Sequence, residues 1–219
     1  MQKLGKRLSY VAQEIGKVKS IADIGTDHGI LIIYALEHGL ADRAFAVDIS
    51  SKSLAKAKNL ACETGLDEMI DFFCGDGLDP LLEIPDVIII AGMGGNEIVK
   101  ILSNKKLLTK YILVPHQDAK EVRKYLVDNG FCILKDYIIF DEKFYPIIVA
   151  QPGKCEYSKS EIVLGANKPP TEWFALRVQK RKQEIDFLLE KNNALINQLK
   201  PEIREEYEEC ARWLASNKL

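Results

Sequence analysis

The stretch Ile21-Ala22-Asp23-Ile24-Gly25-Thr26-Asp27-His28-Gly29 leads from an apolar run into a turn with two glycines, and a second apolar run, residues 30–36, follows at once. This order predicts a short strand, a tight turn and the first turn of a helix. Glycine lets the backbone approach a ligand closely, and the first turn of a helix offers unpaired N–H groups. The stretch is therefore expected to form a nucleotide-binding corner.

The acidic residues of this corner separate it from the dinucleotide fingerprint Gly-x-Gly-x-x-Gly. Asp27 stands where the second glycine of the fingerprint should be, and Asp23 lies two positions before Gly25. A hydride-transferring Rossmann enzyme is therefore disfavoured. Titration with a nicotinamide cofactor would expose an error in this exclusion.

The composition narrows the class of protein. The chain has 219 residues, 47% of them apolar, and a formal net charge of −2. It has no global basic field, so a nucleic-acid partner would need a local basic patch. The five cysteines are Cys62, Cys74, Cys132, Cys155 and Cys210. Since they form no Cys-x-x-Cys pair and the three histidines are dispersed, we expect unpaired cysteines, a reducing compartment and no metal site.

The distribution of apolar residues also bears on location. The N-terminal residues lack the apolar centre of a signal peptide. No apolar run approaches the roughly 18 residues that are needed to span a bilayer. We therefore expect a cytoplasmic protein that has no membrane partner.

From residue 20 onward, strand-like and helix-like segments alternate, as in a parallel sheet covered by helices. Strands are expected at 20–24, 43–48, 69–74, 86–91 and 110–115, and helices at 3–17, 28–38, 50–64, 95–103 and 117–128. After Gly130, two strand-like runs, 131–140 and 143–150, follow each other with no helix between them, which predicts an antiparallel hairpin at the sheet edge. Five parallel strands with connecting helices, followed by a terminal hairpin, are the plan of the class I S-adenosylmethionine-dependent methyltransferases, an α/β Rossmann-like fold.

The residues after Gly153 are expected to form a separate C-terminal domain, so that the chain divides into 1–153 and 154–219. Apolar residues at alternating steps of four and three predict a coiled-coil seam, and a helix continuous over 171–199 would be about 43 Å long. Pro201 interrupts it, and a second helix completes an α-helical coiled-coil hairpin. Two roles stay open for the hairpin: a dimerisation arm, which would make the protein a monomer or a weak homodimer, and an arm that embraces RNA.

Acidic and glycine-rich loops follow the predicted strands at their carboxyl ends, where open α/β sheets bind ligands. Asp48 closes the strand 43–48 and could accept hydrogen bonds from both ribose hydroxyls of an adenosine, with Ile49 beside it. The alternative is that Asp48 caps the helix 50–64, although Ser50 and Ser51 can also cap it.

Two more loops have the same placement. Asp76, flanked by Gly75 and Gly77, could reach the exocyclic amine of an adenine, and a plain Asp-Gly turn is the alternative. Gly92-Met93-Gly94-Gly95 follows the most apolar strand and could clear space for a flat base or a methyl donor beside Met93. A tight strand–helix turn is the alternative there, and it needs one glycine more readily than three.

The motifs Lys6-Arg7-Leu8, Asp23-Ile24-Gly25-Thr26-Asp27-His28-Gly29, Gly75-Asp76-Gly77-Leu78 and Ala91-Gly92-Met93-Gly94-Gly95 resemble those of the bacterial tRNA (adenine-22-N1)-methyltransferases. The resemblance implies S-adenosylmethionine as the cofactor and a tRNA adenine as the substrate. The cofactor residues that follow from it and from the loops are Asp23, Gly25, Thr26, Asp27, His28, Gly29, Asp48, Ile49, Asp76, Gly77, Gly92, Met93 and Gly94.

The chemistry of this reaction gives Asp27 a candidate catalytic role. The N1 atom of adenine already has a lone pair, so no general base is obligatory. Positive charge moves onto the ring as the methyl group arrives, and a carboxylate at the cleft could stabilise it. Asp27 is the candidate, and N-capping of the following helix is its alternative role. His28 is expected to position groups by hydrogen bonding.

Aromatic and basic residues near the cleft are the candidates for RNA contact. They are Lys6, Arg7, His116, Tyr145, Arg177, Lys180 and Arg181, with Phe144 and Lys182 beside them. Two other classes of function stay open from sequence: a small-molecule methyltransferase of the same fold, and a non-catalytic nucleotide-binding or dimerisation module. A pocket with no basic surface around it would favour the small-molecule enzyme, and cofactor binding without turnover would favour the non-catalytic module.

Overall fold

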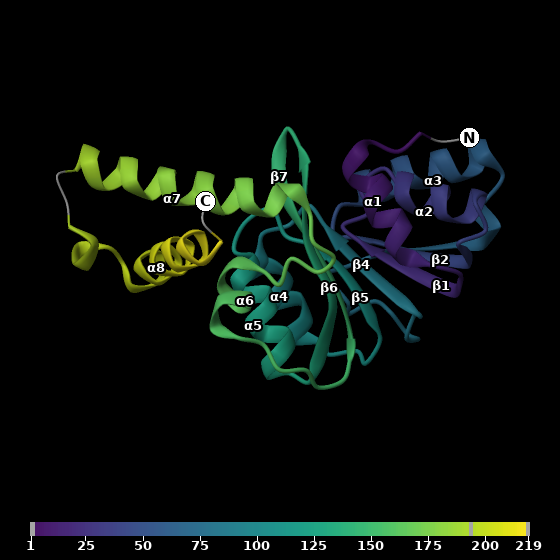
Figure 1. Cartoon of the computed structure of the whole chain (residues 1–219). Coiled ribbons are helices and arrows are strands. Elements are labelled where there is room, and N and C mark those ends of the chain that lie inside the picture. Colours follow the sequence, from purple (N-terminus) through teal and green to yellow (C-terminus); the bar gives the residue numbers. More distant parts are fainter. Residues whose placement is uncertain (1–2, 193–194, 218–219) are drawn as a thin grey trace.

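The fold is organised around one seven-stranded sheet (Figure 1). The computed structural model describes residues 3–192 and 195–217. The strands are β1 (Val18–Ile24), β2 (Ala41–Asp48), β3 (Ile70–Cys74), β4 (Val87–Ala91), β5 (Lys110–Val114), β6 (Phe131–Asp141) and β7 (Lys143–Pro152). Their order across the sheet is β3-β2-β1-β4-β5-β7-β6. Every predicted strand is present, so the predicted fold class is confirmed.

The order of the strands places a ligand crevice at β1 and β4. β1 pairs in parallel with both β2 and β4. The strands after β1 are added on one side of it (β2, β3), and the later strands, from β4 onward, are added on its other side. Such a reversal of strand order opens a crevice at the carboxyl ends of the strands. β7 pairs antiparallel with β5 and with β6, which confirms the predicted hairpin and puts β6 at the edge.

Helices cover both faces of the sheet (Figure 1). On one face, α1 (Lys6–Ile15), α2 (Ile30–Glu37) and α3 (Ser51–Thr64) pack on alternate strand residues, which include Ile21 and Ile89. On the other face, α4 (Gly95–Asn104) and α5 (Ala119–Asp128) pack on Ala22, Ile88 and Ile90. β4 is therefore apolar on both sides, as a central strand of a parallel sheet must be. Two short 3-10 helices lie in the connections between these elements: η1 (Asp67–Met69) before β3, and η2 (Ile196–Gln198) near the C-terminus.

Two helices form the C-terminal arm, α7 (Glu172–Lys191) and α8 (Pro201–Ser216), which pack against each other and extend away from the sheet (Figure 1). The helix is not continuous over 171–199: α7 ends at Lys191, and the Asn192 side-chain amide donates to the Leu188 carbonyl. The predicted seam holds near the sheet, where Phe174, Val178 and Ile185 are buried. Farther along the chain the predicted seam is not buried, since Leu188 is 44% and Leu195 is 65% exposed.

The segment between β7 and α7 contains two features that the sequence reasoning missed. α6 (Lys159–Leu164) begins with a capping box formed by Ser158 and Glu161. Cys132 at the start of β6 and Cys155 beyond β7 form a disulfide, so the expectation that all the cysteines are unpaired is wrong. The β6–β7 pairing brings the two cysteines together, which local sequence does not reveal.

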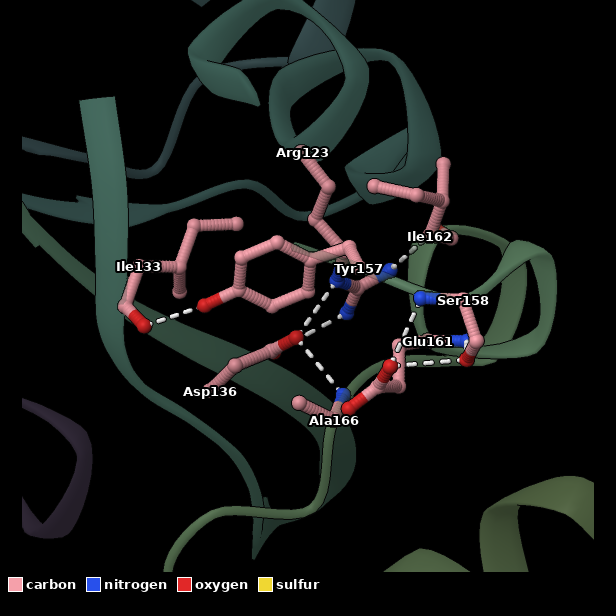
Figure 2. Close-up of polar contacts among 8 residues, drawn as sticks. All are labelled: Arg123, Ile133, Asp136, Tyr157, Ser158, Glu161, Ile162 and Ala166. Atoms are coloured by element: carbon pink, nitrogen blue, oxygen red, sulfur yellow. Dashed lines mark hydrogen bonds and ion pairs between the residues drawn. The ribbon is translucent and has the colours of Figure 1, made fainter. Parts of the chain in front are cut away.

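A buried ion pair fixes the course of this segment (Figure 2). The Arg123 guanidinium on α5 donates to both carboxylate oxygens of Asp136 on β6, from Nε at 2.8 Å and from Nη2 at 3.2 Å. The Ala166 N–H donates to the same carboxylate at 2.9 Å. The Tyr157 hydroxyl donates to the Ile133 carbonyl. These contacts tie the segment before α7 to the sheet and thereby set where the arm begins.

Within residues 3–192 and 195–217, no helix is long and apolar enough to cross a bilayer. The cytoplasmic location stays a prediction from sequence.

Candidate functional site

Backbone hydrogen bonds gather the predicted loops at one edge of the sheet. The N–H groups of Gly25 and Thr26 donate to the Val47 carbonyl at 2.8 and 3.2 Å, which joins the loops after β1 and β2. The Gly75 N–H donates to the carbonyl of Asp48 at 3.1 Å, which adds the loop after β3. These contacts tie the three loops to one another.

Asp48 lies between two of these loops. Its Oδ2 accepts the Asp27 backbone N–H at 3.2 Å, and its Oδ1 accepts the Ser50 N–H at 2.8 Å. Ser50 itself caps α3 by accepting from the Ser53 N–H, so Asp48 is not the helix cap. A carboxylate has about four acceptor positions, so Asp48 retains acceptors for a ligand. Ile49 beside it is 74% exposed and offers an apolar surface at the same place.

Asp23 is the buried acidic group of the corner. Only 7% of the residue is exposed, and its Oδ2 accepts the Thr26 hydroxyl at 3.0 Å. Burial raises the pKa of Asp23 to about 6, the Thr26 hydrogen bond lowers it and the Asp48 charge raises it. The corner therefore holds a carboxyl group whose charge changes just below neutral pH.

Asp27 projects from the turn and does not cap the helix. The residue has a left-handed backbone (φ 44°), and its side chain is 61% exposed. Its Oδ2 lies 2.8 Å from the His28 Nδ1. α2 begins only at Ile30, with Gly29 as its N-cap and no side-chain cap. The helix-cap role that the sequence left open is therefore not realised, and the exposed carboxylate, although in contact with His28, can face a ligand.

Two of the positions after β4 are occupied by glycine for different structural reasons. A Cβ atom on Gly95 would lie 2.2 Å from the Asp118 carbonyl oxygen, so close packing excludes any other residue there. Gly92 has φ 87° and nothing within 4 Å of its Cβ position, so it leaves open space at the edge of the sheet. Met93 Cε lies over Gly25, 2.5 Å from where its Cβ would be. The turn therefore explains both glycines, Gly95 by close packing and Gly92 by its positive φ, and Gly92 also leaves its Cβ position open.

The loop after β3 combines a glycine turn with an exposed acid. Gly75 has Pro80 Cγ 2.4 Å from its Cβ position, and Gly77 has φ 54° with an Ile101 methyl 2.9 Å from its Cβ position. Both glycines are required by the turn. Asp76 between them is exposed at the same edge as Asp48. The structure is compatible with both roles that the sequence left open for this loop.

Four predicted RNA residues meet where α1, β7 and α7 converge. The Arg7 guanidinium lies 5.0 Å from the Tyr145 ring centroid, and the Arg7 backbone N–H donates to Asp141 at 3.2 Å. Lys6 Nζ lies 5.7 Å from the Trp173 ring, and Lys180 Nζ is the same distance from the Phe144 ring.

Two further aromatic residues complete this group, and the sequence reasoning did not include them. Phe140 and Trp173 stack with ring centroids 5.4 Å apart, although they come from β6 and α7. Both are partly exposed. Basic and aromatic groups side by side form a surface that can stack on bases and neutralise phosphates.

The remaining predicted RNA residues, His116, Arg177 and Arg181, line a cavity of about 430 Å³ between the loop after β5 and the arm. The His116 N–H donates to the Met93 carbonyl at 3.0 Å, so the cavity begins beside the loop after β4. Arg181 is engaged in a bidentate ion pair, with Nε and Nη2 each 2.9 Å from a Glu206 oxygen. Lys182 is likewise paired with Asp186, at 2.8 Å.

The acidic and apolar side chains at the carboxyl edge of the sheet fit S-adenosylmethionine, the cofactor expected from the sequence. Asp48 can accept ribose hydroxyls, and Ile49 can cover an adenine ring. Asp23 and Asp48 supply negative charge for a ligand with sulfonium and ammonium groups. The open space above Gly92 can admit the reacting end of the ligand.

Comparison with known proteins gives a consistent result. A family model described as a methyltransferase domain matches residues 4–148. The tRNA (adenine(22)-N(1))-methyltransferase of Bacillus subtilis is 35% identical over 170 residues, which are 75% of this chain and 71% of that protein. The structure of B. subtilis TrmK, an m1A22 tRNA methyltransferase, has TM-score 0.83 at 27% identity and covers 100% of this chain and 98% of that one. M. capricolum TrmK in complex with S-adenosyl-homocysteine has TM-score 0.84 at 25% identity, with 97% and 98% covered.

Proposed function

Because the chain belongs to the bacterial tRNA (adenine-22-N1)-methyltransferase family, we propose that it transfers a methyl group from S-adenosylmethionine to N1 of adenine 22 in tRNA. The observation that supports this most directly is the joining of Asp27, Asp48 and the Gly92 loop at the crevice between β1 and β4. The residues supply the contacts that an adenosine cofactor requires, and an exposed carboxylate lies beside them.

The work of the chain is to bind and orient the two reactants. S-adenosylmethionine supplies an electrophilic methyl group on a positively charged sulfur. Asp48 and Ile49 hold the adenosine part, and the glycine loop at Gly92 leaves room for the target base. Positioning of this kind can contribute roughly 7–11 kcal/mol to catalysis. Adenine N1 needs no deprotonation, so no side chain has to act as a general base.

Asp27 acts on the charge that develops during transfer. As N1 of the adenine gains the methyl group, the ring becomes cationic. The carboxylate of Asp27 stabilises that charge, and His28, 2.8 Å away, holds the carboxylate in place.

The RNA surface that we propose consists of Lys6, Arg7, Tyr145 and Lys180, together with Phe140, Phe144 and Trp173. The net charge of the chain is −2, so this local group must supply the attraction to phosphates. Self-association through the arm and the division into 1–153 and 154–219 stay predictions from sequence.

Incubation with labelled S-adenosylmethionine and bulk tRNA, followed by digestion to nucleosides, tests the proposal. The expected product is 1-methyladenosine. Label in a different nucleoside would overturn the proposed position of methylation, and the absence of label from RNA would overturn the proposed substrate.

Asp48→Ala is expected to weaken S-adenosylmethionine binding about tenfold or more, since hydrogen bonds to a charged group contribute roughly 1.5–3 kcal/mol each. Isothermal titration calorimetry measures this effect. Asp42→Asn, at the opposite end of β2, is the matched control and should bind like the wild type. Equal affinities for Asp48→Ala and the wild type would exclude the ribose contact.

The pKa of Asp23, about 6, predicts a pH dependence of cofactor affinity. Below that pH the carboxyl group is protonated and neutral, and above it the group is anionic and attracts the cationic ligand. Affinity should therefore rise several-fold as the pH rises through about 6. Asp23→Asn should flatten the profile, and a profile unchanged by this substitution would assign the titration to another group.

A further inference from the structure

The cavity between the sheet and the arm is a built space and has no role in the chemistry described above. Its walls include Pro115 and His116 from the loop after β5, Phe144 and Pro146 from β7, Arg177 from α7 and Ile203 from α8. The volume of about 430 Å³ lies within the range of small-ligand sites. Because both the sheet and the arm contribute walls, the cavity is complete only when the arm is docked.

Arg177 differs from the other basic side chains in the walls. Lys120 pairs with Glu205, Arg123 with Asp136 and Arg181 with Glu206. Within the described parts of the chain, 3–192 and 195–217, Arg177 makes no direct hydrogen bond or ion pair, although the charges of Glu206 and Glu184 act on it from a distance. Desolvation by burial lowers the pKa of Arg177. Glu206 is already held by Arg181, so the partly buried Arg177 guanidinium keeps its own N–H donors for an anion.

The remaining charges in the walls select the kind of anion. Asp118, Glu121 and Glu202 also line the cavity, so a free inorganic anion would be repelled from part of it. The ligand must therefore carry an anion for Arg177 and hydrogen-bond donors for the carboxylates. A nucleotide has both, because its phosphate can pair with an arginine and its base has N–H donors. Phe144 supplies an aromatic face for that base, and bases stack on such faces without regard to sequence.

We propose that this cavity binds one unpaired nucleotide of the RNA substrate, with the phosphate on Arg177 and the base against Phe144 and Pro146. The proposal rests on the proposed function in one respect, namely that the substrate is RNA. Since the His116 N–H donates to Met93, the cavity and the Met93 loop are neighbours, and the bound nucleotide lies close in space to the target adenine. Binding it would hold open the structure around the target, which must leave its stack before methylation.

Filter binding of a tRNA transcript that has adenine at position 22, at one fixed salt concentration with S-adenosyl-homocysteine present, tests the proposal. Arg177→Gln removes the positive charge from the cavity. Ile203→Trp fills the cavity and leaves the Arg177 charge in place. Each is expected to raise the Kd for tRNA about tenfold, as for loss of a hydrogen bond to a charged group. Arg204→Gln, on α8 outside the cavity, is the matched control and should bind like the wild type. Arg177→Lys should recover part of the affinity.

The outcomes separate this proposal from the proposed function. If the wild type binds and methylates tRNA while Arg177→Gln and Ile203→Trp bind it as tightly as Arg204→Gln does, the cavity is not a nucleotide site. If the wild type binds tRNA without methylating it, the proposed reaction fails, and the binding comparison still decides the cavity. Unchanged affinity for S-adenosyl-homocysteine and unchanged thermal unfolding show that each variant is folded.

Discussion

Asp27→Asn is expected to lower kcat for methyl transfer about 100-fold, the effect of removing one preorganised electrostatic group. Cofactor affinity should change little, because the Asp27 backbone N–H, which donates to Asp48, is retained. Asparagine tolerates the left-handed backbone at φ 44°, so the substitution adds no strain. Single-turnover rates with tRNA, measured beside cofactor titrations, separate the two quantities.

Asp27→Gly gives an independent check, since glycine removes the carboxylate and also accepts a positive φ. Both variants should lose turnover to a similar degree. His28→Gln should cost less, because it removes only a group that holds Asp27. Turnover of Asp27→Asn close to that of the wild type would show that the carboxylate is not the group that stabilises the charged ring.

Asp136→Asn is expected to lower the free energy of unfolding by about 3–5 kcal/mol, because it leaves the buried Arg123 without its counter-charge. Both side chains are almost completely buried, so water cannot compensate for the loss. The Ala166 N–H also loses its charged acceptor. Urea unfolding followed by far-UV circular dichroism measures the change for the whole chain.

Tryptophan fluorescence shows where the damage lies. Trp173 and Trp213, the two tryptophans of the chain, both pack in the cluster that docks the arm, so their signal reports on the arm. Asp71→Ala breaks the exposed pair with Arg43 and is the control, for which little change is expected. A loss for Asp136→Asn as small as that for Asp71→Ala would contradict the structural role of the buried pair.

The parts of the site that were predictable are those that local sequence determines. Asp48 is the last residue of a strand, and the carboxyl ends of parallel strands meet at one edge, so its place beside Asp27 follows from the order of the elements. The glycines at 92–95 identify a loop after a buried strand in the same way. The helix α6 also had a local signal, the capping box of Ser158 and Glu161, which went unused.

The parts that were not predictable depend on contacts between distant segments. Phe140 and Trp173 lie on different elements, and no pattern in either segment indicates that they stack. The same is true of the Cys132–Cys155 disulfide and of the cavity around Arg177. The coiled-coil seam predicted beyond Ile185 is not formed for another reason. The regular spacing of apolar residues continues past Lys191, but helix α7 ends there.

The most direct test uses two transcripts of one tRNA that differ only at position 22, with adenine in one and guanine in the other. Each is incubated with the protein and S-adenosylmethionine, digested to nucleosides and examined by mass spectrometry. We expect 1-methyladenosine from the adenine transcript and none from the guanine transcript. Equal amounts from both, or none from either, would contradict methylation of adenine 22.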